Sequence, residues 1–172
     1  MVLAGITFIL PARASDSLAS LNKVPAISSN QLTRALEKRH GHVVALHVWA
    51  ACCENCRGTY PGLGSLQRNY PRDGVEVISI LVDLPTKRAD ANKWIKRNPP
   101  PVLLWRKDTS DPDIFAEAIN SDWHGKLPFT QIYSTDGTAA ALIEGPHSIK
   151  AIKQKIDQCL QESARQSQLN NQ

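Results

Sequence analysis

The chain lacks several features that mark specialised classes of protein. It has no internal repeat, and its low-complexity sequence is limited to the polar tail after Glu162, which excludes a repeat array and a mostly disordered chain. Its net charge of +4 is too small to indicate binding to nucleic acid. Its 172 residues, 42% hydrophobic and 21% charged, are typical of one soluble domain with a sizeable core.

The N-terminal apolar run is too short to span a bilayer. It covers only residues 2–10 and is followed by Pro11 and an Ala12-Arg13-Ala14 tripeptide, whereas a spanning helix needs roughly 20 apolar residues. The run and the A-x-A pattern are typical of a secretory signal peptide, although no basic residue precedes the run. We therefore predict a signal peptide at 1–14, followed by a polar leader at 15–27. The alternatives are a buried N-terminal segment, or a membrane tether if cleavage does not occur.

Helix and strand signals alternate along the rest of the chain. Helices are predicted from the Ser28-x-x-Gln31 capping box to Gly41, at 53–70 with a kink at Pro61, at 86–97 and 111–119, and from Ser148 onward. Strands are predicted at 43–50, 75–83, 102–105, 129–134 and 139–144. Successive strand–helix–strand units close as parallel crossovers, whereas the Asp136-Gly137 turn predicts an antiparallel hairpin. We expect an α/β fold whose mixed sheet has a parallel half, a C-terminal hairpin and helices on both faces.

Three of the four cysteines lie at the end of the strand predicted at 43–50. Cys53 and Cys56 are two residues apart, between that strand and a helix N-terminus. There the helix dipole and free N–H groups stabilise a thiolate on the first cysteine, and the second lies one turn away. A zinc site needs two further ligands, and no second C-x-x-C or closely spaced Cys/His pair is present. His40 and His42 lie at a helix end, where the dipole explains them better than a metal does.

The sequence around the cysteines resembles that of thioredoxin-like proteins. V-W-A-x-x-C-x-x-C-R at 48–57 resembles their active-site signature, and Pro61 matches their kinking proline. L-P-F-T at 127–130 resembles their cis-proline loop, which faces the disulfide. Residues 111–128 resemble the TlpA-like branch, whose members are often exported bacterial proteins.

The resemblance implies a role for each matching residue. Cys53 would be the nucleophile and Cys56 the resolving cysteine of a thiol–disulfide oxidoreductase that acts on protein disulfides, more often as a reductase. Pro128 would be the cis-proline beside the substrate backbone, and Leu127 and Trp49 would belong to the same substrate-binding surface.

The resemblance also bears on domain limits, location and partners. It implies a thioredoxin fold at 28–162, with a polar tail at 163–172, in a monomer exported to the bacterial periplasm. Electrons would come from a membrane or soluble thiol donor. No metal or organic cofactor is expected, because the cysteines themselves carry the electrons.

Several positions depart from the family pattern. His47 replaces a buried acid, so it is either a proton acceptor with a pKa nearer neutrality or a core histidine bonded to a backbone carbonyl. Glu54 and Asn55 replace the common Gly-Pro, and a carboxylate there would raise the nucleophile's pKa. Cys52 replaces a tryptophan and is either an exposed reactive thiol or a small residue without consequence. Cys159 is expected to pack in the core.

Cys52-x-x-x-Cys56 also resembles the motif of Sco-like copper chaperones on the same fold. His124 or His147 would then supply the distal histidine, because thiolates and imidazole suit copper. This alternative leaves Cys53 unused and has Arg57 where the Sco pattern has proline, so the redox interpretation fits better. A peroxiredoxin is disfavoured because no Pro/Thr-rich motif precedes the cysteines.

Overall fold

The computed structural model describes residues 24–71, 74–108 and 112–169. The predicted signal peptide at 1–14 and most of the leader lie outside the described residues. So does Asp111, the expected start of the helix predicted at 111–119.

The described residues form one sheet of six strands in the order β1-β4-β3-β2-β5-β6. The strands are β1 (Ala26–Ile27), β2 (Val43–Trp49), β3 (Val75–Leu81), β4 (Leu103–Lys107), β5 (Phe129–Tyr133) and β6 (Ala139–Glu144). β1, β4, β3 and β2 pair in parallel, whereas β5 pairs antiparallel with both β2 and β6. The predicted mixed sheet with a parallel half and a C-terminal hairpin is therefore confirmed.

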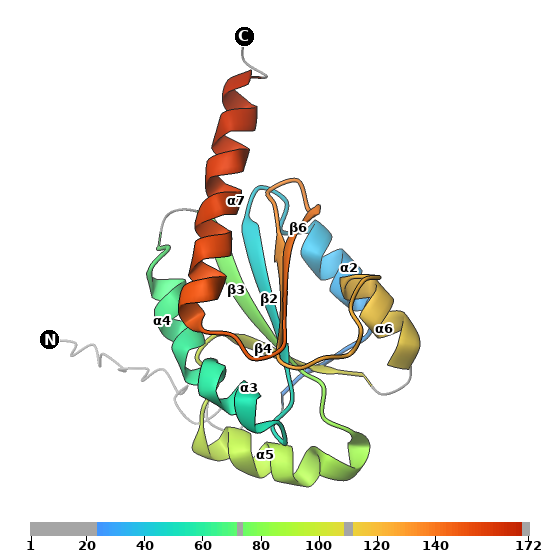
Figure 1. Ribbon diagram of the computed structural model, residues 1–172. Coiled ribbons are helices and arrows are strands. Elements are labelled where there is room, and N and C mark those ends of the chain that lie inside the picture. The colour runs from blue at the N-terminus through green and yellow to red at the C-terminus, as the bar shows by residue number, and fades with distance from the viewer. Residues whose placement is uncertain (1–23, 72–73, 109–111, 170–172) are drawn as a thin grey trace, which may run out of the picture.

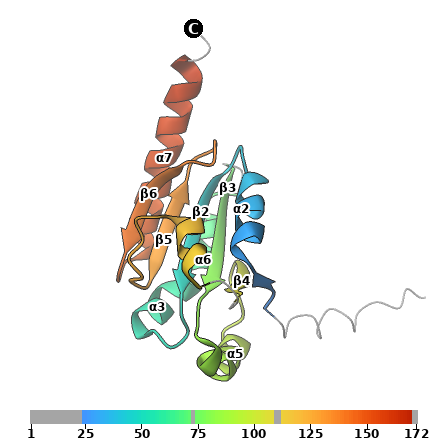
Figure 2. The same cartoon turned by 90° about the vertical axis from the view of Figure 1, so that its right-hand side faces the viewer.

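Helices cover both faces of the sheet (Figures 1 and 2). They are α2 (Ser29–Glu37), α3 (Glu54–Thr59), α4 (Leu63–Arg68), α5 (Arg88–Arg97), α6 (Pro112–Ile119) and α7 (Ile149–Leu169), with short 3-10 turns at Tyr60–Gly62 and Pro85–Lys87. α2 and α6 lie on one face, and α4 and α7 lie on the other. α3 and α5 lie together near the end of the sheet at the bottom of Figure 1.

Strand β2 separates two hydrophobic cores because alternate side chains point to opposite faces of a strand. Val44, Leu46 and Val48 belong to the core beneath α2 and α6. Val43, Ala45 and Trp49 belong to the core beneath α4 and α7, which also contains Cys56. By the same alternation His47 lies on the Cys56 face. All seven residues of β2 are buried, as expected for a central strand.

Besides shifts of a few residues at the ends of elements, the structure differs from the sequence prediction as follows. β1 lies in the segment interpreted as a leader, and its two residues are too few to show a period. The helix predicted at 53–70 is interrupted by the 3-10 turn at Tyr60–Gly62, because Pro61 has no N–H to donate. The last helix continues to Leu169, into the segment interpreted as a tail, with an exposed polar surface.

Candidate active site

The redox pair lies where β2 ends and α3 begins. Cys53 is the N-cap of α3, and its Sγ accepts a hydrogen bond from the Cys56 N–H at 3.3 Å. Cys53 and Cys56 form a disulfide, with their Cα atoms 5.3 Å apart. Cys53 is half-buried, whereas Cys56 is fully buried. Cys53 is thus the more accessible of the two residues.

Asp83 holds the loop that leads to Cys53. It lies two residues after the end of β3. Its carboxylate accepts hydrogen bonds from the backbone N–H groups of Ala51 at 2.9 Å and Cys52 at 3.3 Å. Arg57 Nε donates to the Ala51 carbonyl at 2.6 Å on the other side of the loop. The sequence reasoning missed Asp83. The available signal was an acid at the end of a strand parallel to β2, because neighbouring parallel strands end at the same edge of the sheet.

Trp49, the last residue of β2, is buried in the core next to the loop that carries the cysteines. Its ring is fully buried and contacts Tyr60 in a tilted arrangement and Trp94 edge-on, with centroids 4.2 and 5.3 Å away. Its Nε1 donates to Ser79 Oγ at 2.7 Å. The expected role of Trp49 in substrate binding is therefore wrong, because a side chain without exposed surface cannot contact a substrate. It instead anchors the end of β2 in the core.

The loop before β5 lies beside the end of β2, from which the redox pair follows. The Leu127–Pro128 peptide bond is cis. Leu127 is half-buried and packs against both cores, including the one that contains Cys56. Phe129 pairs with Val48 at the start of β5, which holds the preceding proline beside the end of β2.

His47 is fully buried and bonds to a side chain rather than to the expected backbone carbonyl. Its Nδ1 lies 2.8 Å from Thr130 Oγ1, and its Nε2 has no hydrogen-bond partner among the described residues. Burial, with a smaller contribution from His147, lowers the pKa of His47 to about 3. The expectation of a pKa nearer neutrality is therefore wrong, because desolvation disfavours the charged imidazolium.

Thr130 connects His47 to a second histidine. Thr130 Oγ1 lies 2.8 Å from His147 Nε2, and His147 Nδ1 lies 2.6 Å from the Gly145 carbonyl oxygen. His147 is half-buried, and burial lowers its pKa, opposed by the bond to Gly145. The sequence reasoning weighed His147 only as a copper ligand and missed Thr130.

Comparison with known proteins agrees with this geometry. No family model matches the chain. A thiol-disulfide oxidoreductase ResA of Geobacillus thermodenitrificans is 25% identical over 119 residues, which is 68% of this chain and 63% of the relative. The chain thus spans less than two thirds of that relative's length.

Solved structures match over more of the chain. A secreted thiol-disulfide isomerase from Corynebacterium glutamicum has a TM-score of 0.58 and 19% identity, covering 73% of this chain and 75% of the other. An exposed lipoprotein thioredoxin from Streptococcus pneumoniae has a TM-score of 0.56 and 20% identity, covering 72% and 89%. These likenesses show that the chain has a thioredoxin-like fold.

In this thioredoxin-like chain, the residues between and before the redox cysteines are exposed. Glu54 and Asn55 lie in the first turn of α3 and face solvent. Cys52 is a free, exposed thiol as expected, and it borders a cavity of about 240 Å³ with Arg57 and Lys87. Cys159 is free and buried on α7, which confirms the expectation that it packs in the core.

The copper ligand set of the alternative interpretation does not assemble. Cys56 is fully buried in a disulfide, whereas Cys52 is exposed. His147 Nε2 is bonded to Thr130, and the His124 backbone N–H donates to Glu144 at 3.1 Å. Across residues 24–71, 74–108 and 112–169, no group of three His, Cys, Asp or Glu residues is arranged to hold a metal ion.

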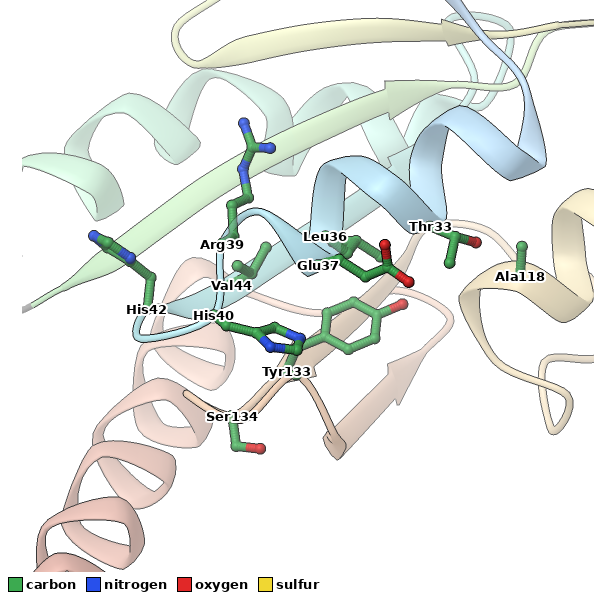
Figure 3. Close-up of a pocket in the computed structure, with 11 residues that line it drawn as sticks. Thr33, Leu36, Glu37, Arg39, His40, His42, Val44, Ala118, Tyr133 and Ser134 are labelled. Atoms are coloured by element: carbon green, nitrogen blue, oxygen red, sulfur yellow. The ribbon is translucent and has the colours of Figure 1, made fainter.

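Another cavity, of about 160 Å³, lies near the start of β2 and so at the end of the strand away from Cys53 (Figure 3). Its lining includes Glu37, His40 and Tyr133, and Figure 3 shows the His42 ring pointing away from the other side chains. It contains no cysteine. Within the part of the chain that the structure describes, no helix is long and apolar enough to cross a membrane.

Proposed function

We propose that this protein is a thiol–disulfide oxidoreductase that acts on protein disulfides through Cys53 and Cys56. The observation that carries the proposal is the Cys53–Cys56 disulfide at the start of α3, with its outer sulfur half-buried and its inner sulfur fully buried. The names of the relatives support the same activity.

The reaction is an exchange of sulfur–sulfur bonds. The Cys53 thiolate attacks a substrate disulfide, forms a mixed disulfide and releases the first substrate thiolate, which takes a proton from water. The Cys56 sulfur then attacks Cys53 Sγ and releases the second substrate thiolate. Two electrons pass to the substrate, and the Cys53–Cys56 disulfide forms. The cis-Pro128 loop, with Leu127, lies beside this pair and binds the extended substrate backbone.

We further propose that the chain works as a reductase in an exported, monomeric form that is fed by a membrane or soluble thiol donor. The relatives described as secreted and as an exposed lipoprotein support export. The reduction potential of the Cys53–Cys56 couple tests the direction. A value near roughly −270 mV supports a reductase, whereas a value near roughly −120 mV would mean an oxidant.

Insulin-disulfide reduction in the presence of dithiothreitol tests the activity itself. Cys53→Ser abolishes turnover because no other exposed sulfur lies at the N-cap of α3. Cys52→Ser is the matched control, since it removes the neighbouring exposed thiol and leaves the redox pair. Full activity of Cys53→Ser would refute the assignment.

Trapping experiments separate the two cysteines. In Cys56→Ser, the mixed disulfide between Cys53 and substrate accumulates because the resolving sulfur is missing. Mass spectrometry of the intact adduct detects it. An adduct on Cys52 instead of Cys53 would contradict the assignment of the nucleophile.

A further inference from the structure

A chain of hydrogen bonds runs from the buried His47 toward the protein surface. It joins His47 on β2 to Thr130 on β5, and Thr130 to His147 in the loop between β6 and α7, with both donor–acceptor distances at 2.8 Å. It ends at the Gly145 carbonyl, 2.6 Å from His147 Nδ1. His47 and Thr130 are fully buried, whereas His147 is half-buried.

The carbonyl at the outer end decides the direction of every bond in the chain. A carbonyl oxygen only accepts, so His147 Nδ1 carries the hydrogen and, in the neutral ring, Nε2 is an acceptor. Thr130 therefore donates its hydroxyl hydrogen to His147, and its oxygen accepts the hydrogen on His47 Nδ1. His47 Nε2 is then left with a free lone pair, buried and without a hydrogen-bond partner among the described residues.

That lone pair lies on the side of the sheet that holds the resolving cysteine. His47 points to the same face of β2 as Ala45 and Trp49, and both belong to the core that contains Cys56. A buried acceptor without a partner costs free energy. A thiol at Cys56, present only in the reduced protein or the mixed disulfide, is a donor that would remove this cost.

We propose that His47, Thr130 and His147 form a relay that carries the proton of the Cys56 thiol to the protein surface when the mixed disulfide resolves. The inference rests on the proposed function and goes beyond it by assigning Thr130 and His147. His47 accepts the proton, and Thr130 and His147 act through His47, because they hold its ring in position and pass the proton outward.

Resolution of the mixed disulfide moves one proton and exchanges one sulfur–sulfur bond for another. The Cys56 S–H proton moves to His47 Nε2, while the Cys56 sulfur forms a bond to Cys53 Sγ. The bond from Cys53 to the substrate sulfur breaks, and the substrate thiolate leaves with the electron pair. His47 passes its Nδ1 proton to Thr130, which passes its own proton to His147, and the half-buried His147 releases a proton to water.

The low proton affinity of His47 in the disulfide state is compatible with this role. Among the described titratable side chains, His147 is the one whose charge acts on His47. No anionic sulfur is present in the disulfide. A thiolate forming at Cys56 would favour the imidazolium of His47 by charge attraction, which raises its pKa during the step.

Stopped-flow kinetics of the two exchange steps tests the relay. Thr130→Val removes the hydroxyl at nearly constant volume and is expected to slow resolution about tenfold or more, as loss of proton transfer does. The attack by Cys53 keeps its rate. Thr130→Ser keeps the hydroxyl and restores resolution to within about twofold of the unchanged chain.

His147→Ala supplies an independent readout. It slows resolution by a similar factor, and added imidazole restores part of the rate because the free base enters the vacated space. His124→Ala, an exposed histidine outside the relay, is the matched control and changes neither step. Melting curves of each variant show that the fold is retained, and the imidazole result stays informative if Thr130→Val is unstable.

The proposal is overturned if Thr130→Val resolves at the rate of the unchanged chain, or if valine and serine slow resolution equally. It is also overturned if imidazole leaves His147→Ala unchanged. These outcomes differ from failure of the proposed function, in which the unchanged chain forms no mixed disulfide at Cys53 and does not reduce insulin.

Discussion

Histidines lie near both ends of strand β2, but only one end leads to cysteines joined in a disulfide. Near the C-terminal end, His47 is buried on the face of β2 whose core contains Cys56, and it is hydrogen-bonded to Thr130. Before the strand begins, His40 and His42 are exposed, and they line a cavity that no cysteine lines. Burial and hydrogen-bond partners, rather than residue type, therefore decide what a histidine can do in this fold.

The loop at the C-terminal end of β2 and the β5–β6 turn near its N-terminal end are stabilised by different kinds of hydrogen bond. Asp83 accepts hydrogen bonds from the backbone N–H groups of Ala51 and Cys52, from a buried position just after the neighbouring strand β3. Asp136 holds the exposed β5–β6 turn by local bonds to Ser134 and Thr138. These bonds lower the pKa of Asp136 to about 2. A long-range bond fixes the active-site loop relative to the sheet, whereas local bonds fix only the turn itself.

The largest expected effect concerns the pH dependence of stability at His47. The pKa of His47 is about 3 in the folded protein, against an ordinary value of 6.5. Between these values the unfolded chain binds a proton that the folded chain does not. Stability therefore falls as the pH decreases, by about 1.4 kcal/mol per pH unit in this window, and does not depend on His47 above pH 6.5.

His47→Leu removes this contribution, so urea denaturation of the variant shows a shallower loss of stability between pH 6.5 and 3. His40→Ala, at the other end of β2, is the control and keeps the slope of the unchanged chain. Equal slopes for His47→Leu and the unchanged chain would show that His47 is protonated in the folded state as readily as in the unfolded one.

The next largest effect is expected at Asp83. Asp83→Ala leaves the N–H groups of Ala51 and Cys52 without their acceptor, which lowers the free energy of unfolding by about 1–3 kcal/mol. It also slows insulin reduction because Cys53 follows this loop. Asp136→Ala, at the opposite end, lowers stability less and leaves the reduction rate unchanged. A wild-type rate for Asp83→Ala would mean that the loop needs no such anchor.

The smallest effect is expected at Gly137 in the β5–β6 turn. Its φ of +85° disfavours any residue with a Cβ, and a Cβ there would collide with the His40 ring. Gly137→Ala lowers stability by about 1–2 kcal/mol, as the left-handed conformation costs for other residues. Insulin reduction stays unchanged. Adding His40→Ala removes the collision and recovers part of the loss, which a double-mutant cycle measures.

Local signals explain why much of the fold and the redox pair could be predicted. The Ser28–Gln31 capping box, the Asp136-Gly137 turn and the apolar runs of the strands each act within a few residues. β1 was not predicted, because its two residues are too few to show the alternation of apolar and polar side chains that indicates a strand. Trp49 was misjudged because its place before the cysteines indicates nearness to the site, but not whether the ring faces solvent.

The sequence by itself determined the order of the elements and the frame in which Cys53 precedes α3, because both follow from short-range chemistry. Only the tertiary structure decided how His47, Thr130 and His147 meet, since 83 positions separate the first pair and 17 the second. Hydrogen bonds between distant residues leave no periodic pattern in the sequence. The pKa of His47 likewise depends on burial, which exists only after the sheet and its helices have packed.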